Sequence, residues 1–135
     1  MIFLDTGYLV ALLDLRDQLH ARALAWAGIV NEPLVLTEYV LWECVNYFSA
    51  PIDRPKAHAL VNLVTSEPAY ELITASPRLF ASGIQMHAER QDKFWSLTDC
   101  ISFFVMHERG IHRALAYDHH FEQAGFEALL RRDPP

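Results

Sequence analysis

Cysteine is scarce in this sequence, and the common metal, nucleotide and hydrolase motifs are missing. Only Cys44 and Cys100 occur. Each falls within an apolar helical pattern, so we expect both in the core and no disulfide. The lack of a CxxC pair or an HExxH motif argues against the usual zinc sites. The lack of GxxxxGK[ST], GxGxxG and GxSxG argues against nucleoside triphosphates, dinucleotides and serine hydrolysis.

Long hydrophobic runs are also absent. No apolar stretch approaches the roughly 20 residues that span a bilayer, and the N-terminus has neither the basic region nor the cleavage site of a signal peptide. We therefore expect no membrane association and a cytoplasmic location. With 135 residues, 52% hydrophobic and 21% charged, the sequence predicts one globular domain spanning residues 1–135.

Positive charge is in short supply. Eleven Lys and Arg stand against seventeen Asp and Glu, which gives a formal net charge of −6. A nucleic-acid-binding protein usually has a basic face, so this balance argues mildly against one. The argument weakens if several of the acids are neutralised by a bound metal ion.

Short apolar runs alternate with longer amphipathic ones, which is typical of an α/β fold with a mostly parallel sheet covered by helices. The runs predict strands at 2–4, 34–36, 70–73, 115–117 and, less regularly, 127–130. They predict helices at 8–13, 18–29, 38–48, 56–66, 76–90 and 98–109, with a short helical turn at 119–124. Residues 131–135 are expected to fray.

Two acids directly follow predicted strands. Asp5 ends the run Ile2–Leu4, and Asp118 ends the run that closes at Tyr117. Ligands of open parallel sheets bind at the carboxyl ends of the strands, where the strand order switches. If these two strands are neighbours, both carboxylates emerge at that edge. The alternative is that each Asp only forms a turn or caps a helix.

Two further acids lie within helical patterns. Glu43 falls on the apolar stripe formed by Val40, Cys44, Tyr47 and Phe48, where an acid is uncommon. A stripe-edge Glu that reaches water, or a Glu paired with an Arg, is the alternative. Asp99 opens a helix behind Ser96 or Thr98, where a capping box would also explain it. A first-turn acid nevertheless projects past the helix end, towards the sheet edge.

Carboxylates that converge repel one another and favour a divalent cation. Ligation by oxygen alone suits Mg²⁺ or Mn²⁺, which can lower the pKa of a bound water and stabilise displacement at phosphorus. The other candidates are weaker. We expect the seven His to be mostly surface or capping residues. The pairs Phe94-Trp95 and Phe103-Phe104 are expected in the core, with stacking on a nucleobase as the alternative.

The four acids stand in segments that resemble one known family. Ile2–Thr6, Thr37–Glu43, Trp95–Phe103 and Arg109–Phe126 are similar to the four blocks of the PIN-domain ribonucleases, specifically the VapC-like toxins of toxin–antitoxin pairs. The resemblance spans nearly the whole chain and is most specific from Trp95 to Phe126. Gly7 departs from the pattern, because the family often has Ser there.

This resemblance implies a PIN-like three-layer α/β/α fold with four to five strands. It implies an endoribonuclease that needs Mg²⁺ or Mn²⁺, held by the catalytic acids Asp5, Glu43, Asp99 and Asp118. Thr6, Ser96 and Thr98 are expected to support these ligands by hydrogen bonds. An RNA substrate, a cognate antitoxin protein and a homodimer are also implied.

Two other functions remain open from the sequence. A metal-dependent phosphatase or DNA nuclease could use the same acids, although Asp5-Thr6-Gly7 lacks the second acid of a phosphoaspartate phosphatase. A non-catalytic binding module could keep the acids for structure or for docking a partner.

Overall fold

The computed structural model describes residues 1–135 and contains one fully parallel five-stranded sheet. The strands are β1 (Ile2–Leu4), β2 (Leu34–Thr37), β3 (Tyr70–Ile73), β4 (Arg113–Leu115) and β5 (Glu127–Ala128). They are ordered β3-β2-β1-β4-β5, and all four neighbouring pairs are parallel. The α/β prediction with four to five strands is confirmed.

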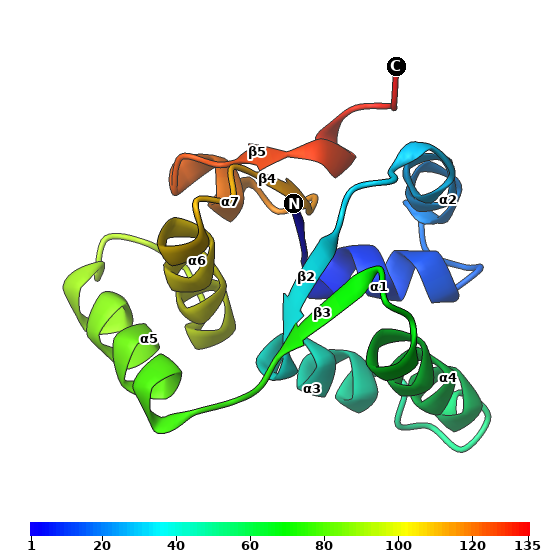
Figure 1. Cartoon of the computed structure of the whole chain (residues 1–135), viewed down its shortest axis with the longest axis horizontal. Helices are drawn as coiled ribbons and strands as arrows, with labels where there is room; N and C mark the ends of the chain where they lie inside the picture. The colour runs from blue at the N-terminus through cyan, green and yellow to red at the C-terminus, as the bar shows by residue number, and fades with distance from the viewer.

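Helices cover both faces of this sheet. They are α1 (Thr6–Leu13), α2 (His20–Ile29), α3 (Glu38–Tyr47), α4 (Arg54–Ser66), α5 (Pro77–Glu89), α6 (Leu97–Arg109) and α7 (His119–Gln123), with a 3₁₀ turn at Leu129–Arg131. Figure 1 shows α1, α2 and α4 on one side of the strands and α5 and α6 on the other. A parallel sheet needs apolar cover on both faces, and a cluster of 31 buried residues supplies it. None of the helices combines the length and apolar character needed to cross a bilayer.

Local sequence signals explain where the helices begin and end. Thr37 Oγ1 accepts a hydrogen bond from the Val40 amide at 3.2 Å and so caps α3. Ser76 caps α5 in the same way, with Pro77 at its first position. Gly110 ends α6 with a φ of 64°, a left-handed conformation that glycine adopts without strain. The predicted helices agree with these bounds to within about two residues.

The strand predicted at 115–117 was placed two residues too late in the sequence, because β4 spans Arg113–Leu115. β4 pairs with β1 through Phe3↔Ala114 and Leu4↔Leu115, and it already begins at Arg113. The polar Arg113 can begin β4 because its side chain forms an ion pair with Glu32. β1 ends at Leu4, so the ladder stops there and the apolar run beyond it has no strand to pair with.

The C-terminal strand prediction also needs correction. The strand expected at 127–130 ends at Ala128, and the chain then turns into the 3₁₀ helix. Fraying of residues 131–135 stays a prediction, although the Arg132 carbonyl accepts a hydrogen bond from Trp26 Nε1 at 2.9 Å. The Leu130 carbonyl accepts another from Arg22 at 3.0 Å. Both contacts tie the chain end to α2.

Two aromatic predictions were wrong. Trp95 and Phe103 are buried as expected, but Phe94 is 94% exposed. Tyr47 is 56% exposed rather than part of the apolar stripe of α3, and its hydroxyl donates to Asp14.

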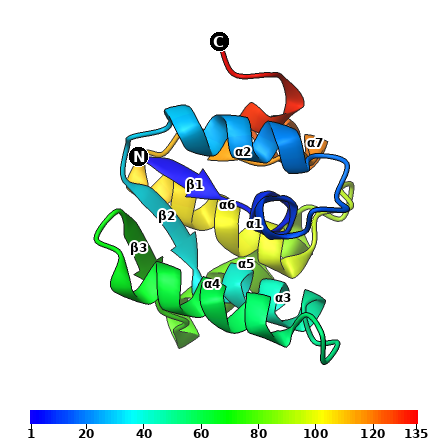
Figure 2. The same cartoon turned by 90° about the vertical axis from the view of Figure 1, so that its right-hand side faces the viewer.

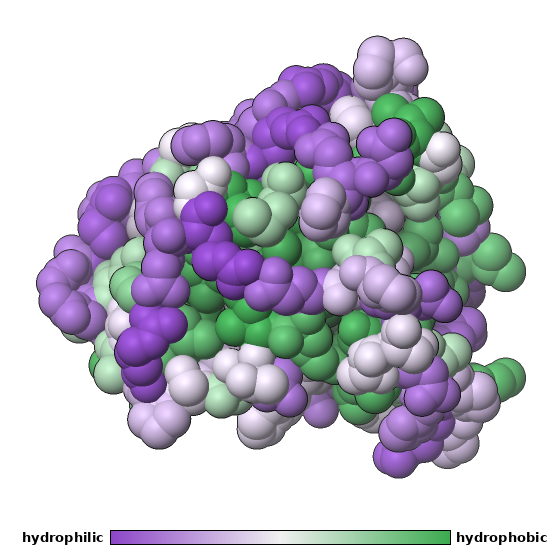
Figure 3. Space-filling view, viewed as in Figure 1, coloured by the Kyte–Doolittle hydropathy of each residue, from purple (hydrophilic) through white to green (hydrophobic).

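Figure 3 shows that exposed hydrophobic residues also gather at the centre of the face seen in Figure 1, with hydrophilic residues around and across them.

The strand order positions the functional edge of the sheet. From β1 the chain proceeds outward through β2 to β3, and it then returns to the other side of β1 to form β4 and β5. The order therefore switches between β1 and β4. In Figure 2, β1 points towards the side of the molecule where α1 begins. A ligand site is expected at that edge.

Candidate metal centre

The four predicted acids line one cleft at the switch point. The cleft is open to solvent and has a volume of about 680 Å³. It contains Asp5, Glu43, Asp99 and Asp118, together with a fifth acid, Asp17. The other lining residues include Thr6, Ser96, Phe94, Tyr117, His119, His120 and Arg131. Segments that lie far apart in the sequence thus supply one acidic concavity.

Asp5 joins the two central strands at the base of the cleft. Its amide donates to the Leu115 carbonyl at 3.2 Å, and its carbonyl accepts from the Leu9 amide at 3.3 Å in the first turn of α1. Burial raises the pKa of Asp5 to about 7, and the charges of Asp99, Glu43 and Asp118 add to this, while a hydrogen bond from the Thr6 backbone opposes it. The carboxyl group thus lies in a site that is short of positive charge.

Glu43 reaches the cleft from α3. Its Oε1 accepts a hydrogen bond of 2.7 Å from Thr6 Oγ1, and it has no Arg or Lys partner. The next residue, Cys44, is fully buried, and burial followed by the charges of Asp5 and Glu43 raises the pKa of its thiol to about 12. The acid on the apolar stripe therefore points to Thr6 and the cleft, not to a salt bridge.

Asp99 both takes part in the cap of α6 and lines the cleft. Its Oδ2 accepts from the Ser96 amide at 3.1 Å, while the Asp99 amide donates to Ser96 Oγ at 3.0 Å, which completes a capping box. Burial raises the pKa of Asp99, against the hydrogen bonds from Ser96 and His120. The cap fixes the orientation of a carboxylate that also lines the cleft, so the two explanations are compatible.

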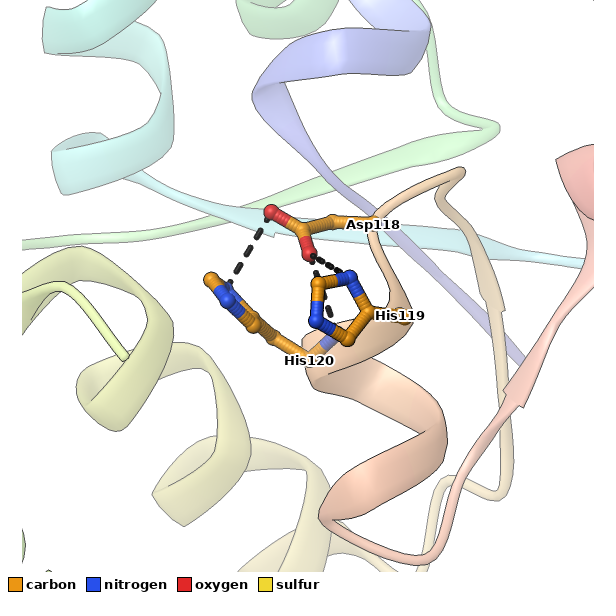
Figure 4. Close-up of side chains that lie close together, drawn as sticks. All are labelled: Asp118, His119 and His120. Atoms are coloured by element: carbon orange, nitrogen blue, oxygen red, sulfur yellow. Dashed lines mark hydrogen bonds and ion pairs between the residues drawn. The ribbon is translucent and has the colours of Figure 1, made fainter. Parts of the chain in front are cut away.

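Asp118 lies in the loop before α7 and contacts two histidines (Figure 4). Its Oδ1 accepts from the His120 amide at 3.0 Å and lies 3.4 Å from His119 Nδ1. His120 Nδ1 lies 3.2 Å from Asp118 Oδ2 and 3.0 Å from Asp99 Oδ2. The imidazole of His120 thus bridges Asp99 and Asp118.

The sequence analysis missed His120, and its interpretation as a surface or capping residue was wrong. Its side chain is only 15% exposed and faces two acids. The available signal was its position two residues after Asp118, at the start of α7. Asp17 and Arg131 were missed because nothing in their local sequence indicates the cleft. Thr98 neither lines the cleft nor hydrogen-bonds to any of the four acids.

The donor set fits a divalent cation. Four carboxylates share the cleft, their ion-pair partners are only His119 and His120, and the pKa of Asp5 is raised to about 7. Burial raises this pKa most and the neighbouring acids add to it, and a bound cation would offset both effects. Carboxylate oxygens suit Mg²⁺ or Mn²⁺. The only group of potential ligand atoms that all lie within 4.8 Å of one another is formed by Asp118, His119 and His120, and ring nitrogens would favour a softer ion there.

Comparison with known proteins points to one family. The PIN domain model matches residues 2–127 of this chain. The 23S rRNA-specific endonuclease VapC20 of Mycobacterium tuberculosis is 32% identical over 130 residues, which is 93% of this chain and 95% of VapC20.

Solved structures share the fold of this chain. A crystal structure of VapC20, described as a sarcin-ricin loop cleaving toxin, superposes with a TM-score of 0.86 at 24% identity, covering 93% of this chain and 96% of that one. FitAcB from Neisseria gonorrhoeae superposes with a TM-score of 0.67 at 18% identity, covering 95% of this chain and 96% of that one. Matched over nearly its whole length by the family model, with the expected sheet and acids at its switch point, the chain belongs to the PIN domain family.

Proposed function

We propose that this protein is a metal-dependent endoribonuclease and the toxin component of a toxin–antitoxin pair. The observation that carries the proposal is the convergence of four carboxylates, without an Arg or Lys partner, in one open cleft. Similarity to VapC20 over 93% of the chain supports the activity.

Asp5, Glu43, Asp99 and Asp118 would hold one or two Mg²⁺ or Mn²⁺ ions. Such an ion, when bound, would lower the pKa of a water and offset the charge that builds on the phosphate. The chain's own contribution is to hold these carboxylates in fixed positions before the substrate arrives. Asp118 is more exposed than Asp99, with 42% of its side chain accessible against 13%, and its role would be to adjust the site.

Hydrogen bonds hold two of these carboxylates in place. The Thr6 hydroxyl donates to Glu43, and Ser96 holds Asp99 through both halves of the capping box. Donors around metal ligands orient them and raise metal affinity. On the basis of these contacts, we propose that Thr6 and Ser96 hold the metal-binding carboxylates in position. For Thr98 the role remains a prediction, because no contact supports it.

The decisive test is cleavage of RNA by purified protein with Mg²⁺, with Mn²⁺ and with EDTA, compared with Asp99→Asn. Because VapC20 is described as specific for 23S rRNA, ribosomal RNA belongs beside a mixed RNA pool as substrate. Asp133→Asn is the matched control, since Asp133 is 81% exposed and does not line the cleft. We expect metal-dependent cleavage that Asp99→Asn abolishes and Asp133→Asn retains.

The same assay separates the alternatives. Cleavage of a DNA strand or release of phosphate from a phosphomonoester, without RNA cleavage, would replace the proposal by a DNA nuclease or a phosphatase. A folded protein that binds Mn²⁺ but leaves every RNA intact would favour a non-catalytic binding module. RNA cleavage in EDTA would overturn the metal mechanism.

The proposed partners are a cognate antitoxin and a second copy of this chain. Both rest on the resemblance to VapC-like toxins. The exposed apolar surface seen in Figure 3 is compatible with self-association. Light scattering coupled to gel filtration would give the mass of the particle for comparison with the 15.5 kDa chain. Co-purification with the product of an adjacent small gene, and loss of RNA cleavage in that complex, would test the antitoxin.

A further inference from the structure

Phe94 is the most exposed large apolar side chain of the protein, at 94%, and it lines the acidic cleft. A single exposed hydrophobic residue needs no explanation by itself. The position of Phe94 in this cleft does need an explanation, because the surrounding lining is dominated by carboxylates, histidines and hydroxyls. A flat apolar ring at the edge of a site for phosphate chemistry matches the chemistry of a nucleobase face.

The backbone that carries Phe94 is firmly anchored by its neighbour. Trp95 is buried, its indole Nε1 donates to Gln123 Oε1 at 3.0 Å, and its ring packs edge-on against Phe103 at 5.0 Å. The Arg90 guanidinium covers the Trp95 ring at 4.8 Å. Two residues after Phe94, Ser96 starts α6 through the capping box. The Phe94 ring therefore stands on a fixed backbone, which lowers the entropic cost of binding against it.

Tyr117 supplies a second aromatic ring to the same cleft. It is 44% exposed and directly precedes Asp118. The Arg131 guanidinium lies over its ring at 5.0 Å, donates to the Tyr117 carbonyl at 2.9 Å and pairs with Glu122 at 3.1 Å. Arginine planes extend aromatic stacks and attract phosphate. Arg131 is also the one Arg or Lys that lines the cleft.

We propose that Phe94 and the Tyr117–Arg131 pair are stacking platforms for two unpaired RNA bases on either side of the phosphodiester held at the carboxylates. This inference rests on the proposed ribonuclease function and adds a substrate determinant to it. Phe94 lies two residues before the cap of Asp99, and Tyr117 immediately before Asp118, so each platform is fixed to one of the acids. Bases inside a duplex are already stacked, so the platforms select loops and single strands.

The proposal explains how a protein of net charge −6 holds RNA. Stacking on aromatic rings contributes to affinity without a basic surface, and it tolerates any base, since every base has a π-face. Binding to this chain is therefore less sensitive to salt than binding that depends on many phosphate contacts.

The test is equilibrium binding of a single-stranded RNA oligonucleotide labelled with 2-aminopurine, in EDTA so that no cleavage occurs. We expect binding to change the fluorescence of the base analogue, and Phe94→Ala to weaken binding roughly 5- to 150-fold, the range for loss of one stacked base. Phe94→Trp should retain binding. Tyr117→Ala should weaken it while Tyr117→Phe retains it. Ile52→Ala is the control, because Ile52 is 85% exposed and lines no cleft.

The outcomes separate this inference from the ribonuclease proposal. If the wild type cleaves RNA with metal while Phe94→Ala and Tyr117→Ala bind and cleave like the wild type, the platforms are refuted and the nuclease stands. If RNA binds in EDTA and both alanine variants lose affinity but no metal supports cleavage, the platforms stand and the nuclease fails. Equal binding of a hairpin stem and of its single strand would overturn the selection of unpaired bases.

Discussion

Replacement of Asp5 by asparagine should stabilise the metal-free protein while removing its activity. The Asp5 carboxyl has its pKa raised from 3.8 to about 7 by burial and by the other acids of the cleft. Asparagine keeps nearly the same shape but does not ionise. The substitution therefore removes a charge that the metal-free fold tolerates poorly, and with it a proposed metal ligand.

The magnitude follows from the linkage between ionisation and folding. Below pH 3.8 the carboxyl is protonated in both states, so it imposes no penalty. As the pH rises to about 7 the unfolded chain ionises first, and the folded wild type loses stability relative to Asp5→Asn. Above pH 7 the penalty is constant. The raised pKa corresponds to roughly 1.5 kcal/mol at pH 5 and about 4 kcal/mol at pH 8. These are upper limits, because the cleft is open to water.

Chemical denaturation in EDTA at pH 5 and pH 8 measures this effect, with Asp133→Asn as the control for loss of a surface carboxylate. We expect Asp5→Asn to raise the unfolding midpoint at pH 8 much more than at pH 5. In a thermal scan at pH 8 the upper limit of about 4 kcal/mol corresponds to a gain of roughly 14 °C for a chain of this length. A destabilised Asp5→Asn, or a gain that does not change with pH, would refute the argument that burial and the neighbouring acids raise the pKa of Asp5.

Three further predictions concern metal binding, the packing of α5 against α6, and the Ser96 cap of α6. Mn²⁺ at a hundred times its dissociation constant should stabilise the wild type by about 2.7 kcal/mol and Asp99→Asn far less, by thermal shift. Gly83→Ala should cost about 1–3 kcal/mol in denaturation, because its Cβ would lie 2.3 Å from Ile101 Cγ1 between α5 and α6; unchanged stability would contradict this close packing. Ser96→Ala should cost about 1 kcal/mol and reduce cleavage more than binding, whereas unchanged cleavage would show that the cap does not position Asp99.

The fold class and the acids were accessible from the sequence because each leaves a local signature. A short apolar run followed by Asp5, an acid on the stripe of α3 and a capping motif before Asp99 are patterns within a few residues. Periodicity indicates most of the buried residues, although not Tyr47, and caps indicate where helices begin. These patterns predicted a parallel sheet, and the sheet has five parallel strands.

The errors occur where distant segments decide the local structure. β4 begins at the polar Arg113 because Glu32 pairs with it and β1 sets its register. Phe94 points outward because Trp95, its neighbour, takes the contacts with Phe103 and Gln123. The local sequence pattern does not show that Arg113 pairs with Glu32. Nor does it show that Trp95 contacts Phe103 and Gln123.

The sequence by itself determined the helices, to within about two residues, and the parallel α/β class, because helix and strand periodicity and capping act over short distances. It also singled out Asp5, Glu43, Asp99 and Asp118 as candidate site acids. Tertiary structure alone decided that His120 bridges Asp99 and Asp118 and that Arg131 and Phe94 line the same cleft as the acids. It also decided that the pKa of Asp5 rises to about 7. Burial and the repulsion between carboxylates depend on distances through space, and only the folded chain sets those distances.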